Sequence, residues 1–182
     1  MSDFWIYFQI GLQHVLSLNA YDHILFLVVL IAPYLLKDWK QILILVSVFT
    51  LGHTLTLFFS LFGIFLLKTG TIEFFILLSI LITALFNMIS TGFISKSLKI
   101  KSIRTIAALF GIIHGLGFSN YFNTILTGNF LDKLLPTLSF AIGIETAQII
   151  IVLCILTASF LSQHFLKISK RDWLLITSSI VI

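Results

Sequence analysis

Residues 41–66 read QILILVSVFTLGHTLTLFFSLFGIFL, an apolar run whose one ionisable side chain is His53. A helix of about 20 such residues is long enough to cross the hydrocarbon layer of a bilayer. A soluble protein cannot hide this much apolar surface, because its outer shell must be polar. The run therefore predicts a membrane-spanning helix with a polar group near its centre.

The rest of the chain has the same character. Of the 182 residues, 59% are hydrophobic and 10% are charged, and the mean hydropathy is +1.13. Six more apolar segments lie near residues 4–17, 22–36, 72–91, 103–121, 134–163 and 172–182. We therefore expect an all-α, polytopic helical membrane bundle that forms a single domain over residues 1–182. It should have about seven transmembrane segments, of which the first and last are short, with the first two forming a hairpin.

Basic residues indicate the orientation in the membrane. Alternate connections carry nine Lys and Arg residues on one side and only Lys68 and Lys133 on the other. Cytoplasmic loops are enriched in Lys and Arg, so the first side should be cytoplasmic and should include the N-terminus. The nine residues are Lys37, Lys40, Lys96, Lys99, Lys101, Arg104, Lys167, Lys170 and Arg171.

Composition also excludes other classes of protein. The net charge of +4 comes from loop residues rather than from a basic stripe, which argues against nucleic-acid binding. The single cysteine, Cys154, lies in an apolar run, so no disulfide framework is expected. The N-terminus lacks the basic region of a cleavable signal peptide. The sequence gives no indication of the oligomeric state.

Ionisable side chains inside the apolar segments are the candidate functional residues. Such groups cost several kcal/mol in a bilayer unless they are paired, and they usually mark functional sites. A lone histidine in an apolar helix is more often a packing residue than a ligand. Four histidines and two carboxylates at similar depth favour a shared site for a divalent transition metal ion such as nickel, cobalt or zinc. The six candidate metal ligands are His14, Asp22, His23, His53, His114 and Glu145.

Other polar residues have more ordinary explanations. Ser79, Thr83 and Asn87 recur every four residues and should form one polar stripe facing the bundle interior. Glu73 stands at the start of a helix, where a carboxylate is favourable in any case. His164 borders a basic connection and is expected to be an interfacial residue. Asp22 could be a ligand, or it could orient an imidazole by accepting its second N–H.

An ordered set of motifs resembles the HupE/UreJ family. The set comprises His14-x7-Asp22-His23, Thr50-Leu-Gly-His53, His114-Gly-Leu-Gly-Phe118 and Gly143-Ile-Glu145. It covers the chain from the first segment to the sixth. The resemblance implies a nickel or cobalt permease of the bacterial inner membrane, with six to eight spans.

The motifs also depart from the hydrogenase-associated branch of that family, which carries His-x5-Asp-His and Phe-His-Gly-x-x-His-Gly-x-Glu. In the second motif, Phe110 stands in place of the first histidine and Gly117 in place of the glutamate, while Gly111, His114 and Gly115 match. Glu145 on the next segment is a candidate replacement for the missing carboxylate. The chain thus resembles a divergent branch.

Two main functions are compatible with the sequence. The first is a permease for a divalent transition metal ion, with a site open to the outer face and the metal ion and the lipid bilayer as its partners. The second is an intramembrane zinc-dependent hydrolase similar to alkaline ceramidases, in which a metal-bound water attacks a lipid-like substrate. Transport is favoured over an enzyme, and no catalytic residue is assigned. Haem bound by His53 and His114 is a third and weaker interpretation.

Overall fold

The computed structural model describes residues 3–17, 21–63, 68–93, 96–126 and 128–182. Within these ranges all of the regular secondary structure is helical, and the last residues of the expected segment 41–66 lie outside them. The helices are α1 (Asp3–Leu16), α2 (Tyr21–Ile31), the 3-10 turn η2 (Leu36–Asp38), α3 (Trp39–Ser60), α4 (Thr69–Phe93), α5 (Lys96–Ile125), α6 (Phe130–Phe165) and α7 (Lys170–Val181).

Four helical stretches of the described residues are long and apolar enough to cross a membrane. They are Leu36–Ser60, Thr69–Ile89, Ser102–Ile125 and Phe130–Phe165. The helices α1 and α2 form a pair bent by 69° that passes the same test as a unit. With 12 residues, α7 reaches only roughly 18 Å at 1.5 Å per residue. The structure thus supports four spans, or five with the bent pair, and the expected seven crossings are not confirmed.

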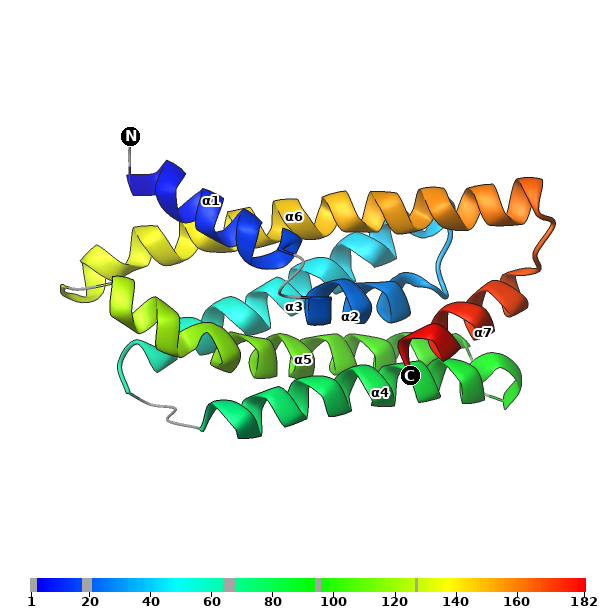
Figure 1. Cartoon of the computed structure of the whole chain (residues 1–182), viewed down its shortest axis with the longest axis horizontal. Helices are drawn as coiled ribbons and strands as arrows, with labels where there is room; N and C mark the ends of the chain where they lie inside the picture. The colour runs from blue at the N-terminus through cyan, green and yellow to red at the C-terminus, as the bar shows by residue number, and fades with distance from the viewer. Residues whose placement is uncertain (1–2, 18–20, 64–67, 94–95, 127) are drawn as a thin grey trace.

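The bent pair differs from the expected hairpin. In Figure 1, α1 and α2 follow one another in the same general direction along the bundle. Their 14 and 11 residues give roughly 21 and 17 Å of helix. Each helix alone is too short to span, so together they resemble one span with a break in its middle.

This arrangement also bears on the N-terminus. The start of α1 lies at the end of the bundle where α3 leads to α4 and α5 leads to α6 (Figure 1). The nine basic residues belong to the opposite end, where α2 leads to α3, α4 to α5 and α6 to α7. The expected cytoplasmic N-terminus is therefore not confirmed, since that expectation counted α1 and α2 as two crossings.

The outside of the bundle is apolar, as lipid contact requires. Large exposed apolar side chains occur along the long helices, for example Leu51 at 61%, Phe74 at 60% and Leu153 at 55%. In water such a surface would drive aggregation, whereas in a bilayer it contacts lipid chains that are equally apolar.

Glycines allow two helix pairs to approach closely, as in membrane bundles generally. A Cβ at Gly111 of α5 would overlap the Phe49 carbonyl oxygen of α3, and one at Gly115 would overlap the His53 carbonyl oxygen. Gly11 and Gly143 serve the α1–α6 pair in the same way. These contacts fix how α1 and α5 lie against their neighbours.

The expected polar stripe of α4 faces the bundle interior. Ser79, Thr83 and Asn87 are each at most 2% exposed. The Asn87 amide donates to the Val29 carbonyl oxygen at 2.6 Å and so ties α4 to α2. The stripe therefore contributes to packing beside the histidines.

Candidate metal centre

The break between α1 and α2 brings two helix ends together inside the bundle. His14 lies in the last turn of α1, while Asp22 and His23 lie in the first turn of α2. The C-terminal end of a helix favours positive charge, and the N-terminal end favours a carboxylate such as Asp22. Broken helices of this kind form ion sites in membrane transporters.

Two further histidines reach the same place from α3 and α5. The side chains of His53 and His114 are 0% and 1% exposed. The ring centroid of His23 lies 4.7 Å from that of His14 and 4.8 Å from that of His114. The rings of His14 and His53 are 5.7 Å apart. The four histidines therefore form one cluster, here called the imidazole cluster.

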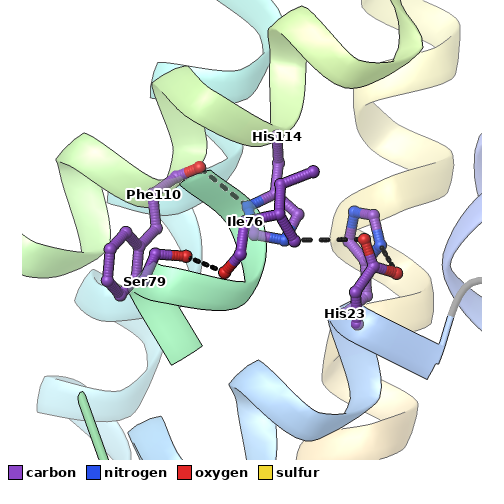
Figure 2. A network of polar contacts seen from close by, with 6 residues as sticks. His23, Ile76, Ser79, Phe110 and His114 are labelled. Atoms are coloured by element: carbon purple, nitrogen blue, oxygen red, sulfur yellow. Dashed lines mark hydrogen bonds and ion pairs between the residues drawn. The ribbon is translucent and has the colours of Figure 1, made fainter. Parts of the chain in front are cut away.

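The tautomer of His114 follows from its hydrogen bond. Its Nδ1 lies 2.9 Å from the carbonyl oxygen of Phe110 on the preceding turn. A carbonyl oxygen can only accept, so Nδ1 donates and carries the proton, and Nε2 keeps its lone pair. Figure 2 shows this nitrogen on the side of the ring that faces His23.

Five ring nitrogens of the cluster are buried with no hydrogen-bond partner among the described residues. They are His14 Nε2, His23 Nε2, His53 Nδ1, His53 Nε2 and His114 Nε2. An unpaired buried polar atom is costly, and native structures rarely contain several together without a functional reason. The unprotonated nitrogen of a neutral imidazole is a common ligand of transition metals, so ligation could satisfy one such nitrogen on each of the four rings.

The carboxylate that lies beside the imidazole cluster is that of Asp22. Its Oδ1 lies 3.2 Å from His23 Nδ1, and its Oδ2 lies 3.9 Å from His114 Nε2. If His23 Nδ1 carries the proton, it donates a hydrogen bond to Asp22. His23 Nε2 then keeps the lone pair that can bind a metal ion. The carboxylate also supplies negative charge against a bound cation.

The donor atoms form two overlapping groups that could hold a metal ion. One comprises His14, His23 and His53, and the other comprises Asp22, His23 and His114. Within each group the donor atoms lie within 4.8 Å of one another. Ligands around a tetrahedral zinc at about 2.1 Å are about 3.4 Å apart, so a modest inward movement would complete either site.

A cavity of about 350 Å³ leads to the cluster between α2, α4 and α5. Its wall includes His14, Asp22, His23 and His114, with Thr69 and Glu73 contributed by the start of α4. From the sequence, the main explanation of Glu73 is its place near a helix N-terminus, with a functional contact as the less favoured alternative. Glu73 lines the same cavity as the histidines because α4 packs against α2, and no local sequence pattern reveals that packing.

Two residues named from the sequence lie elsewhere. The Glu145 carboxylate belongs to neither group and accepts a hydrogen bond from the Ser47 hydroxyl at 2.7 Å. His164 stacks on Phe160 near the end of α6 and is exposed.

Aromatic rings lie around the imidazole cluster. The Phe118 ring centroid lies 4.0 Å from that of His14, and Phe140 lies 5.7 Å from it. Phe49 is 5.3 Å from His114. Such rings exclude water and strengthen electrostatic interactions within the cluster. The spacing of Phe118, four residues after His114, was the available signal.

Long apolar helices around a buried cluster of histidines and a carboxylate define an integral membrane protein with a candidate metal centre. The chain belongs to the HupE/UreJ protein family, whose model matches residues 1–182, the whole chain. This family is associated with nickel and cobalt transport. No curated protein and no solved structure matches the chain.

Proposed function

We propose that this protein is a membrane permease for a divalent transition metal ion, nickel or cobalt, with the imidazole cluster and Asp22 as its binding site. The observation that carries the proposal is the set of five buried, unpartnered ring nitrogens at the break between α1 and α2. Four neutral imidazoles and one carboxylate match the ligand preferences of these ions.

The charge distribution supplies the orientation in this proposal. The end with nine basic residues faces the cytoplasm of a bacterial inner membrane, and the N-terminus faces outward. The part of the cavity wall formed by Thr69 and Glu73 near the start of α4 then lies nearest the outside. Glu73 attracts the ion, and His14, Asp22 and His23 receive it.

The driving force comes from the membrane. A doubly charged cation that moves into a negative interior gains about 4.6 kcal/mol per 100 mV. The chain has no P-loop sequence for nucleotide binding, so ATP hydrolysis is not part of the proposal.

Ion uptake by proteoliposomes containing the purified protein tests the proposal. With a negative interior potential, Ni²⁺ or Co²⁺ should enter faster than into protein-free vesicles, and His53→Ala should abolish the difference. Equal rates in both kinds of vesicle would reject the permease.

An intramembrane zinc hydrolase is the second candidate. Three ligands from His14, His23 and His53 would leave a fourth position on zinc for a water molecule. The cavity wall also includes the apolar side chains of Ile76 and Leu77, which suit a lipid-like substrate. Stoichiometric zinc that survives purification, together with cleavage of a lipid amide, would support this alternative. Weakly held metal would support the permease, because a carrier must release its ion.

A further inference from the structure

A second polar cluster lies between α3 and α6, outside the imidazole cluster. The Thr50 hydroxyl donates to the Gln148 amide oxygen at 2.9 Å, and the Ser47 hydroxyl donates to Glu145 at 2.7 Å. We call Ser47, Thr50, Glu145 and Gln148 the α3–α6 polar cluster. Both bonds join residues on facing helices, so the cluster is a tertiary feature.

The buried half of this cluster has unused bonding capacity. Gln148 is 0% exposed and Thr50 is 4% exposed, yet Gln148 Nε2 has no partner among the described residues. Rotation of the amide by half a turn would let Nε2 donate to Thr50 Oγ1 and would free Oε1 as an acceptor. The cluster can therefore offer an additional oxygen ligand.

The half-buried part carries an uncompensated charge. Among the described residues Glu145 bonds to the neutral Ser47, and no basic side chain pairs with it. Its position is 15 residues after Phe130 in the 36-residue helix α6, or roughly 22 Å along the axis. A carboxylate at such depth is costly without a counter-charge. A passing cation would provide one.

The order of residues along α3 connects the two clusters. Thr50 precedes His53 by three residues and Ser47 precedes it by six, so they lie roughly 4.5 and 9 Å nearer the start of the helix. Residues three apart share a helix face. The start of α3 is the end of the bundle with the basic residues. Thr50 and Ser47 therefore both lie between His53 and that end, so a cation that leaves His53 toward it passes the level of the α3–α6 polar cluster.

We propose that the α3–α6 polar cluster is a second cation station, which takes a divalent ion from His53 and passes it toward the basic end of the bundle. The station rests on the proposed permease function and supplies its inner half. Its ligands are oxygens of two hydroxyls, an amide and one carboxylate. Oxygen ligands hold nickel and cobalt less tightly than imidazoles do, so the station favours release.

Glu145→Gln is the main test, because glutamine keeps an acceptor for Ser47 and removes the charge. In Co²⁺ uptake by proteoliposomes, we expect the rate to fall at least 10-fold. The equilibrium Co²⁺ affinity of the imidazole cluster in detergent should stay within 2-fold of wild type. Asp172→Asn, which neutralises a carboxylate at the start of α7, is the matched control and should leave both values unchanged.

Two results would overturn the station. The first is unchanged uptake by Glu145→Gln. The second is a parallel loss of uptake, Co²⁺ affinity and thermal stability, which would mean that the cluster only joins α3 to α6. Gln148→Leu repeats the test in the buried half if the first variant is poorly folded.

A binding measurement separates the station from the permease itself. His53→Ala should lose tight Co²⁺ binding but retain a weaker site in equilibrium dialysis, and adding Glu145→Gln should remove that weaker site. No weaker site in His53→Ala would reject the station even if wild-type vesicles transport. Failure of wild-type vesicles to transport, with the weaker site present, would reject the permease and leave a second cation site.

Discussion

The imidazole cluster and the α3–α6 polar cluster differ in what they offer an ion. The first consists of nitrogen donors that are nearly all buried. Four different helices contribute them, at the place where α1 ends and α2 begins. The second consists of oxygen donors between two continuous helices, and it is half-buried at Glu145. Buried nitrogen donors favour capture of a transition metal ion, while the weaker oxygen donors favour its release. A permease needs both properties, and they occur in separate places along α3.

The largest expected effect comes from breaking the imidazole cluster. His53→Ala removes two unpartnered nitrogens from the centre of the cluster. Because loss of an outer partner alone weakens metal binding by about 10–100-fold, loss of a ligand should exceed about 100-fold. Isothermal titration with Ni²⁺ in detergent measures the change. His164→Ala, an exposed histidine outside the cluster, is the control, and similar affinities for the two variants would contradict the assignment.

Gly111→Ala breaks the scaffold rather than the donors. The new Cβ would overlap the Phe49 carbonyl oxygen and force α5 away from α3. Overpacking of this kind destabilises proteins by about 1–3 kcal/mol, and here it would also displace His114. Thermal unfolding in detergent should show the loss. Gly117→Ala on the same helix meets only side-chain atoms at 3.4 Å or more and should unfold like the wild type.

Asp22→Asn sharpens the comparison by removing the carboxylate of the imidazole cluster. The amide can still contact His23, which lies 3.2 Å away, but the negative charge is lost. We expect Ni²⁺ affinity to fall by about 10–100-fold, in the range of outer-partner substitutions. An unchanged affinity would show that the imidazoles alone define the site.

Glu73→Gln should have the smallest effect, because Glu73 lies on the cavity wall and is exposed. Its charge can raise the local cation concentration without holding the ion. Uptake at low ionic strength should slow by about 2–5-fold, and the difference should vanish near 1 M salt, where the screening length is about 3 Å. A defect that persists at high salt would instead make Glu73 a ligand.

The fold was predictable where the signal is local. Apolar runs such as residues 41–66 were long enough to identify α3 to α6 as helices that could span a membrane. Whether the first two segments form a hairpin or a single broken span was not predictable in this way. A hairpin and a broken span have the same apolar pattern, and only the packing of α1 against α6 and of α2 against α4 distinguishes them.

The candidate site was partly predictable for a related reason. Each buried histidine carries a cost that the sequence reveals, and His14, His23, His53 and His114 do lie together. Burial of Glu145 carries the same cost, but the direction in which its side chain points depends on how α6 is rotated against α3. The structure places it beside Ser47 rather than with the histidines.

The sequence by itself determined that this protein belongs in a bilayer and which ionisable residues stand in its apolar segments, because hydropathy and the cost of burying charge are properties of the residues. Only the tertiary structure decided that the histidines meet beside the bent helix pair α1 and α2 and that Glu145 and Gln148 form a separate cluster. Those outcomes depend on helix rotation and on close approach at glycines such as Gly111, which arise from contacts between segments far apart in the chain.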